Sequence, residues 1–321
     1  MHAVHNEPPR REVKPVNAVI RQAVSLSRQL SEFVAAGSTE VTTHDDKYLE
    51  ELARILPAGY RVYVAHTPKA SIDDVARVAL RVQELGLTAS PHIIARRVRD
   101  AAQLRRVLGA LAAGGVGQVL LVAGDIAAPG GPFASTVELL DTGILGDSGI
   151  TRVGVAGHPE GHPAVPQELL WEALERKQAI ARATGLRMHI ATQFGFDTRS
   201  LGAFEQGLAA HGIELPVHAG VAGPTPLLKL LKYAAHCGVG ASLKAVSGNS
   251  AMLGRLPHLA TRADEMLLEV LKAKQENRDS RIFAPHFFAF GGVLETARWL
   301  RGVVQGSFEL DKAGRGFAIR S

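Results

Sequence analysis

The segment Gln118-Val119-Leu120-Leu121-Val122-Ala123-Gly124-Asp125 lies near the middle of the chain, and the fold prediction starts from it. Its apolar residues run without interruption from Val119 to Ala123 and end at a glycine followed by a carboxylate. A continuous apolar run of this length is typical of a parallel strand that is covered on both faces. The segment therefore predicts an α/β protein in which helices flank a parallel sheet.

Similar runs recur on both sides of this segment and alternate with stretches of helical period. The predicted strands are Ser38–His44, Tyr60–His66, Ser90–Ala95, Gln118–Gly124, Thr151–Gly157, Arg187–Gln193, Glu214–Gly220 and Ile282–Phe290. The predicted helices are Tyr48–Leu56, Ser71–Leu85, Arg99–Ala113, Ala134–Leu145, Pro166–Thr184, Leu201–His211, Pro226–Cys237, Arg262–Lys274 and Leu294–Val304. A further helix is expected near Arg21–Ala36, before the first strand.

This alternation predicts a (β/α)₈ TIM barrel, with the extra N-terminal helix covering its base. A doubly wound open sheet is the alternative, but no G-x-G-x-x-G follows the first predicted strand. No repeat or linker divides the chain. We therefore expect a flexible basic segment over 1–20, one catalytic barrel over 21–305 and a C-terminal tail over 306–321.

The composition indicates a globular protein with small-molecule partners. Apolar residues make up 46% and charged residues 21% of the 321, and the net charge is only +5. An excess this small and this dispersed argues against nucleic-acid binding. One cysteine, Cys237, excludes an internal disulfide framework and a Cys-based zinc site. We find no transmembrane run and no secretory signal, and we expect a cytoplasmic protein.

Chemistry in TIM barrels lies at the C-terminal ends of the strands, and three segments there stand out. Gly154–Pro163 combines two histidines, a glutamate and two prolines. Val122–Ser135 is rich in small residues whose backbone N–H groups suit a phosphate, and Asp125 lies at its start. Thr192–Asp197 presents a carboxamide, Gln193, which suits the amide edge of a pterin or flavin ring.

Each segment also has a plain structural interpretation: a rigid turn, an ordinary loop or a core strand end. Histidines on several predicted strands could converge on a metal, but no H-x-H follows the first strand. We expect no metal site.

Taken together, these segments resemble the methylenetetrahydrofolate reductase family. The family's G-V-A-G-Y-P-E-G-H-P is similar to Gly154–Pro163, with His158 in place of the tyrosine, and its T-Q-F-F-F-D is similar to Thr192–Asp197. Its A-P-H-L-T-C resembles Ser90–Ala95, and its R-G-D loop resembles Ala123-Gly124-Asp125. Its Y-A-S resembles Phe133-Ala134-Ser135, and its I-P-G-I-M-P turn lies near Val217–Gly223. The resemblance spans roughly residues 20–305.

The resemblance implies a TIM barrel that reduces 5,10-methylenetetrahydrofolate to 5-methyltetrahydrofolate in one-carbon metabolism, with hydride passing from NADH or NADPH through bound FAD. It implies that Glu40 is the general acid, that Asp125 lies near the folate ring and the flavin, and that Gln193 binds the folate. The positions expected to hold FAD are His92, Gly124, Asp125, Phe133, Ala134, Ser135, His158 and His162. A homo-oligomer and a role in methionine biosynthesis also fit the family.

Several positions depart from the family's pattern. The arginine of R-G-D is Ala123, the tyrosine before A-S is Phe133, and the arginine after the last strand is Gly291 or Gly292. The family's lysine after the fifth strand has only Lys177 as a near match, about a helical turn out of register. Four alternatives therefore stay open: a member that works without flavin, one that oxidises methyltetrahydrofolate, a folate- or flavin-binding protein without turnover, and a metal-dependent barrel hydrolase.

Overall fold

The structure is a computed structural model, and it describes residues 16–195, 198–226 and 262–320. The described strands are β1 Ser38–Thr42, β2 Arg61–Ala65, β3 Thr88–Ile94, β4 Gln118–Val122, β5 Arg152–Gly157, β6 Arg187–Phe194, β7 Val217–Ala222, β8 Ile282–Phe288, β9 Phe308–Leu310 and β10 Phe317–Ile319. The α-helices are α1 Val16–Ala35, α2 Leu49–Ile55, α3 Ile72–Glu84, α4 Ala101–Ala113, α5 Thr136–Asp141, α6 Ile144–Asp147, α7 Gln167–Thr184, α8 Arg199–Ala210, α12 Ala263–Glu276 and α13 Val293–Val304. Two 3₁₀ helices, η1 Thr43–Tyr48 and η2 Ala95–Arg97, follow β1 and β3.

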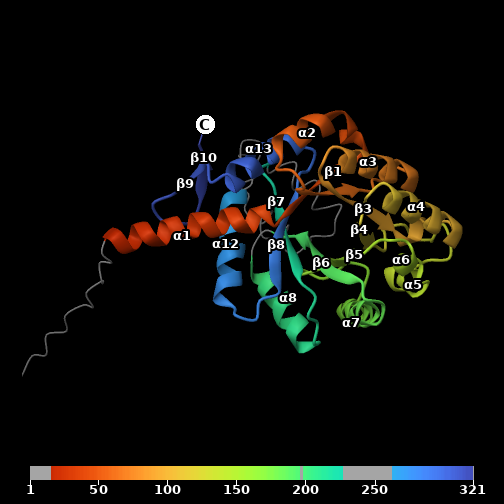
Figure 1. The fold of residues 1–321 in the computed structure, drawn as a ribbon. Helices are drawn as coiled ribbons and strands as arrows, with labels where there is room; N and C mark the ends of the chain where they lie inside the picture. The colour runs from red at the N-terminus through yellow and green to blue at the C-terminus, as the bar shows by residue number, and fades with distance from the viewer. Residues whose placement is uncertain (1–15, 196–197, 227–261, 321) are drawn as a thin grey trace, which may run out of the picture.

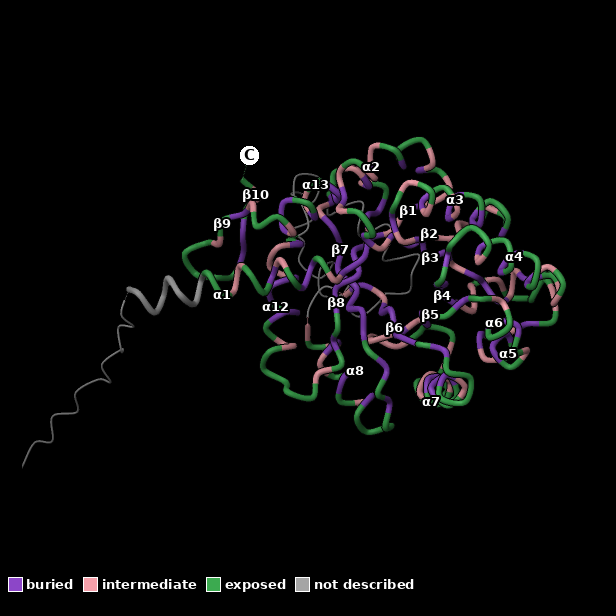
Figure 2. Tube along the Cα trace, in the orientation of Figure 1, coloured by how far each residue is buried: buried purple, intermediate pink, exposed green. Residues whose placement is uncertain are grey.

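Strands β1 to β8 form a closed parallel barrel in chain order, and β8 pairs with β1. The helices surround the strands, as Figure 1 shows, and Figure 2 shows that burial is concentrated on the strands and on the inner sides of the helices. The (β/α)₈ TIM barrel predicted from the sequence is therefore confirmed. The large apolar core lies between the strands and the helices and includes Val62, Val119 and Val153.

The inside of the barrel has a separate and much smaller apolar cluster. Tyr63, Leu120 and Ala191 form it, with Val122 packed against them. Strand residues alternate between the outer core and the barrel interior, which explains why neighbours such as Val119 and Leu120 belong to different clusters. Polar side chains take most of the remaining interior positions.

Some element boundaries differ from those predicted. The first strand ends at Thr42 rather than His44, because the Thr42 side chain and Asp45 form a capping box that starts η1. The predicted helix Ala134–Leu145 is two short helices, α5 and α6, separated by Gly143 in a left-handed conformation with φ 71°. The predicted helix Pro226–Cys237, with Cys237, lies outside the described residues apart from its first position.

Both ends of the described chain pack beside the barrel. Helix α1 contacts α13, α12 and β8, so it lies along the barrel wall. The last residues form the β9–β10 hairpin, in which the Phe317 ring stacks on Trp299 of α13 at 5.5 Å. Within the part of the chain that the structure describes, no helix is both long enough and apolar enough to cross a membrane.

Candidate functional site

Glu40 lies on β1 with its side chain only 16% exposed, and it faces His286 of β8. Burial, reinforced by the nearby charge of Asp45, raises the pKa of Glu40 to about 8. The Nε2 atom of His286 lies 4.0 Å from Oε2 of Glu40, which is beyond hydrogen-bond distance. A carboxyl group with this pKa still carries its proton near neutral pH and can donate it to a bound molecule.

His286 is held in place and kept uncharged by its surroundings. Its Nδ1 atom lies 2.8 Å from the hydroxyl of Ser38, and the ring is 2% exposed. Burial above all, together with the neighbouring His92 and His189 and the charge of Arg61, lowers the pKa of His286 to about 3. A neutral imidazole beside Glu40 does not pull the proton from the carboxyl group, so the pair stays uncharged.

Tyr63 lies at the centre of the barrel interior and connects these residues to others. Its ring is 4.6 Å from that of His286 and 6.0 Å from that of His92. Its hydroxyl lies 2.7 Å from Nε2 of His189. Gly154 leaves room for this pairing, because a Cβ there would lie 2.9 Å from Nε2 of His189. Sequence reasoning assigned neither Tyr63 nor His286 to the site.

His92 is the predicted cofactor-binding residue that lies on a barrel strand, β3, where its side chain is partly buried. Burial, with the nearby His66, lowers its pKa to about 3, so the ring is neutral. Its Nε2 atom is inaccessible to water and has no hydrogen-bond partner among the described residues. A buried nitrogen without a partner is costly, so this atom is free to bind a ligand.

The loop after β4 is folded around Arg96. The Arg96 guanidinium donates to the carbonyls of Ala134 and Ile126 at 2.9 and 3.0 Å, and its backbone N–H donates to the Ala123 carbonyl at 3.1 Å. Gly124 has φ 97°, and a Cβ there would lie 2.4 Å from a methyl group of Ile94. The structure thus requires a glycine at this position and leaves the side chain of Asp125 exposed.

The next residues of this loop begin helix α5, with Ser135 as its N-cap. The Ser135 hydroxyl accepts from the backbone N–H of Glu138 at 3.2 Å, and the Ala134 N–H donates to the Glu138 carboxylate at 2.6 Å. Phe133 is 6% exposed and belongs to the main core. The Ala134 N–H of the stretch that resembles the family's Y-A-S is therefore already engaged by a negative charge, and the Ser135 hydroxyl serves as a helix-capping acceptor.

His158 and His162 follow β5 and lie edge to face, with ring centroids 5.2 Å apart. Burial lowers the pKa of His158 to about 4, and His162 is exposed. Lys177 of α7 is 8% exposed, burial lowers its pKa to about 8, and no described carboxylate pairs with it. Its charge acts on His158, so a cation lies close to this loop.

Gln193 lies near the end of β6 and is half-buried. Its Oε1 atom accepts from the backbone N–H of Phe194 at 3.2 Å, which leaves the amide nitrogen to donate. Phe194 is 1% exposed and packs against Phe288 and Phe290, so it is a core residue. Phe290 has φ 46°, a strained conformation of the kind that recurs at functional sites. Phe196 and Asp197 lie outside the described residues.

The structure thus brings Glu40 and His92 to opposite sides of Tyr63 inside the barrel, while Asp125, Ser135 and His162 lie on the loops that follow β4 and β5. Among the described residues, no group of three or more histidine, cysteine, aspartate or glutamate side chains is arranged to hold a metal ion.

The family model of methylenetetrahydrofolate reductase matches residues 47–243, more than half of the 321-residue chain. This protein belongs to the methylenetetrahydrofolate reductase family. The match makes it a folate-related oxidoreductase in kind, and members of this family generally use a flavin. The matched range contains His92, Asp125 and Gln193, whereas Glu40 lies before it.

Two solved structures are also similar to this reductase-family chain. A crystal structure of oxaloacetate acetylhydrolase is 12% identical, with 88% of this chain and 86% of that chain covered and a TM-score of 0.47. Oxaloacetate acetylhydrolase in complex with the inhibitor 3,3-difluorooxalacetate is 12% identical, with 92% and 88% covered and a TM-score of 0.46. Likenesses at this level support nothing further about this member of the family.

The loops of this family member fit FAD only in part. The unpartnered Nε2 of His92 and the glycine at position 124 suit a bound ring system, and Lys177 suits an anion. The diphosphate side does not fit, because Ala123 supplies no cation and the Glu138 carboxylate already accepts from the Ala134 N–H. A carboxylate at that position repels a diphosphate.

Proposed function

We propose that this protein reduces 5,10-methylenetetrahydrofolate to 5-methyltetrahydrofolate with hydride from NADH or NADPH. One observation carries the proposal: Glu40 is held protonated inside the barrel of a folate-related oxidoreductase, with its pKa raised to about 8. The reaction needs a proton at the folate nitrogen that leaves the bridging carbon, followed by hydride delivery to that carbon. A positioned acid typically accelerates such a step by ~10²–10⁴-fold.

In this proposal Glu40 donates its proton to the bridging nitrogen, and the ring opens to an iminium carbon. Hydride addition to that carbon gives the methyl group, and solvent returns the proton to Glu40. The net reaction consumes one NAD(P)H and one proton. Gln193 donates from its amide nitrogen to the pterin edge, and Asp125 orients the folate ring from the loop after β4.

FAD is the cofactor that the family implies, and we assign no step to it because the diphosphate side of the loop does not fit. The same observation favours a second candidate, in which hydride passes directly from the nicotinamide to the folate. In both candidates His92, Gly124, Phe133, Ala134, Ser135, His158 and His162 belong to the cofactor side of the site. A homo-oligomer remains a prediction.

Turnover and the absorption spectrum together test the proposal. Purified protein is mixed with methylenetetrahydrofolate and NADH or NADPH, and 5-methyltetrahydrofolate is measured by mass spectrometry. Product formation accompanied by flavin bands in the near-ultraviolet and blue supports the FAD route, and product formation by colourless protein to which FAD adds nothing supports direct transfer. Folate binding without turnover in either direction would contradict both and indicate a binding protein.

A further inference from the structure

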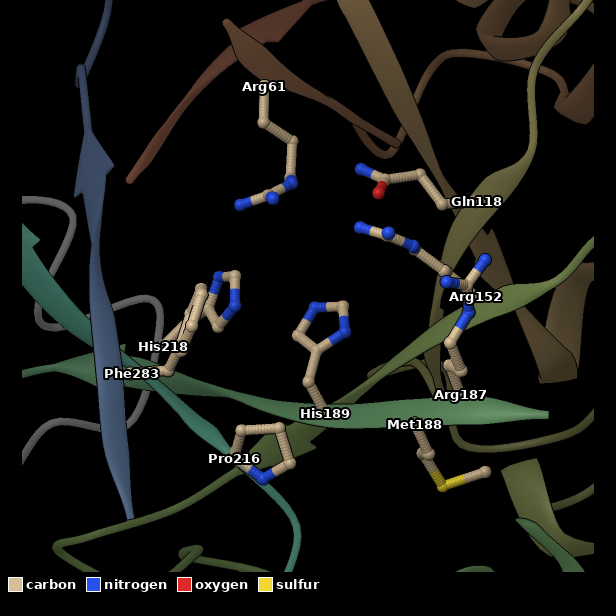
Figure 3. A pocket seen from close by; sticks show the side chains of 9 residues that line it. All are labelled: Arg61, Gln118, Arg152, Arg187, Met188, His189, Pro216, His218 and Phe283. Atoms are coloured by element: carbon tan, nitrogen blue, oxygen red, sulfur yellow. The ribbon is translucent and has the colours of Figure 1, made fainter. Parts of the chain in front are cut away.

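A cavity opens at the end of the barrel opposite to the loops just described. Arg61, Gln118, Arg152 and Arg187 are the first residues of β2, β4, β5 and β6, so they mark the N-terminal mouth. They line a cavity of about 220 Å³ together with Met188, His189, Pro216, His218 and Phe283. In Figure 3 the side chains of Arg61, Gln118, Arg152, His189 and His218 converge on this space. We call it the basal cavity.

The basal cavity collects positive charge without a described counterion. Gln118, Arg152 and Arg187 are direct register partners on adjacent strands, which lie ~4.8 Å apart. No carboxylate lines the cavity, and none of its arginines forms an ion pair with a described residue. The acidic residues outside the described ranges are only Glu7, Glu12 and Asp197, since the sequence from 227 to 261 contains none. Like charges held this close repel one another until an anion binds.

The arginines differ in how far they are already engaged. Arg61 donates to the carbonyl of Ala36 at 3.2 Å, and Arg187 reaches the hydroxyl of Thr151 at 3.4 Å. The Arg152 guanidinium makes no hydrogen bond to a described residue. Its donors are thus available to a ligand in the cavity.

Two buried polar groups of the same cavity also lack partners. Gln118 is 3% exposed and His218 is 4% exposed, and neither Nε2 of Gln118 nor Nδ1 of His218 has a hydrogen-bond partner among the described residues. Burial above all, and then the positive charges of Arg61 and Arg152, lowers the pKa of His189 to about 3. Buried polar atoms without partners are rare in folded proteins, and they point to a ligand that would satisfy them.

We propose that the basal cavity binds the phosphate or carboxylate group of a small anionic metabolite. Guanidinium groups match the oxygens of both groups in a two-pronged arrangement, and the Gln118 amide adds a neutral donor. The apolar remainder of such a ligand would lie against Met188, Pro216 and Phe283, of which Phe283 is 52% exposed at the rim.

This site is separate from the site of the proposed reaction. Tyr63 lies between the two sites, because its ring packs on His286 beside Glu40 and its hydroxyl lies 2.7 Å from Nε2 of His189, which lines the basal cavity. None of the residues assigned to folate or cofactor lines the basal cavity. The inference therefore stands or falls independently of the proposed reduction.

Titration calorimetry with inorganic phosphate, and in a second arm with malonate, tests the inference on the full chain at constant ionic strength in chloride. We expect saturable 1:1 binding of at least one anion, and the tighter one identifies the phosphate or the carboxylate as the preferred group. Arg152→Gln should weaken that binding ~10- to 100-fold, because a hydrogen bond to a charged group is lost. Arg105→Gln, which removes the same charge from an exposed position on α4, should leave binding unchanged.

Melting temperatures give a second readout, which separates anion binding in the cavity from a general effect of removing one positive charge. Without an anion, Arg152→Gln should melt at the same temperature as the wild type or at a higher one, because the repulsion between like charges decreases. If Arg152→Gln fails to fold, Arg187→Gln replaces it as the cavity variant. The tighter-binding anion should then raise the melting temperature of the wild type and of Arg105→Gln by more than that of the cavity variant. Absence of binding by both anions, or an equal response in all three proteins, would overturn the inference.

Discussion

The most informative residue of the site is Glu40, because its environment sets its protonation state. Burial raises its pKa to about 8, whereas the family's reaction needs a proton donor at neutral pH. The carboxyl group owes this property to its place inside the barrel, beside a neutral His286. Its function and its effect on stability therefore have the same physical origin.

Replacing Glu40 by glutamine should remove the acid and keep the shape. We expect Glu40→Gln to lower kcat by ~10²–10⁴-fold while folate affinity stays within about tenfold. In the wild type, kcat should fall as the pH rises through about 8, and the residual activity of the variant should lack that limb. A near-native kcat in Glu40→Gln would remove Glu40 from the mechanism.

The same variant has a stability signature of defined sign. The pKa of Glu40 in the folded protein lies above its unfolded value of 4.5, so the folded state holds the extra proton between pH 4.5 and about 8. Stability from this group is present at low pH and is lost as the pH rises through that range. The melting temperature of Glu40→Gln, relative to that of the wild type, should therefore be higher at pH 9 than at pH 5. Calorimetry of both proteins at the two pH values measures this difference.

Gln193 gives a second test at the residue scale. If its amide nitrogen donates to the folate, Gln193→Ala should raise the apparent KM for folate ~3- to 100-fold, since a hydrogen bond is lost or its partner is left unsatisfied. The KM for NAD(P)H should change little. Equal folate binding by wild type and variant in titration calorimetry would make Gln193 a structural residue at the end of β6.

At the scale of elements, the close approach of β6 and β7 depends on Gly220. A Cβ at this position would lie 2.6 Å from the carbonyl oxygen of Thr192 and 2.7 Å from the carbonyl carbon of Gln193. Both contacts are with backbone, so the strands would have to separate. This pairing also holds Gln193 in place, because the Gly220 N–H donates to the Thr192 hydroxyl at 2.8 Å.

We predict that Gly220→Ala lowers the free energy of unfolding by ~1–3 kcal/mol, as overpacking typically does. Gly202→Ala is the matched control, because Gly202 lies inside α8 with nothing within 4 Å of its added Cβ. That change should be neutral or stabilise by up to ~1 kcal/mol through helix propensity. Chemical denaturation of both variants checks the pair, and equal effects would show that the β6–β7 contact is not tight.

At the scale of the whole molecule, the barrel interior contains an unusual number of buried, neutral histidines. His92, His189, His218 and His286 all have a pKa that burial lowers below the ordinary value of 6.5, to about 3 for His92, His189 and His286. Their rings pack around Tyr63 and on one another, and the His189 and His218 centroids are 4.4 Å apart. Uncharged imidazole rings are therefore part of the packing inside this barrel.

These histidines predict a loss of stability in mild acid. Their folded pKa lies below the unfolded one, so the unfolded chain binds more protons below pH 6.5, and stability falls as the pH decreases from there toward 3. Each histidine contributes a slope of ~1.4 kcal/mol per pH unit within that window. Urea denaturation at pH 7, 6 and 5 measures the slope. Glu40 acts in the opposite sense over this range and offsets about one histidine, so a flat profile would contradict the neutral-histidine interior.

The sequence by itself determined the barrel, because eight apolar runs alternate with helical stretches and this periodicity leaves few other topologies. It also indicated the family, since the segments around Asp125, His158 and Gln193 keep their spacing in the chain. Local sequence signals did not predict two element boundaries. Asp45 ends β1 early through its capping box with Thr42, and Gly143 divides one predicted helix into two.

Only the tertiary structure decided which of these residues can act together. Glu40, Tyr63 and His286 come from strands far apart in sequence, and the raised pKa of Glu40 arises from burial that no local pattern encodes. The basal cavity was likewise hidden, because Arg61, Arg152 and Arg187 are ordinary isolated arginines until the closed barrel brings their strand starts to one mouth. The burial of a side chain and the meeting of residues from different strands are properties of the packed barrel. The spacing of residues along the sequence predicts neither of them.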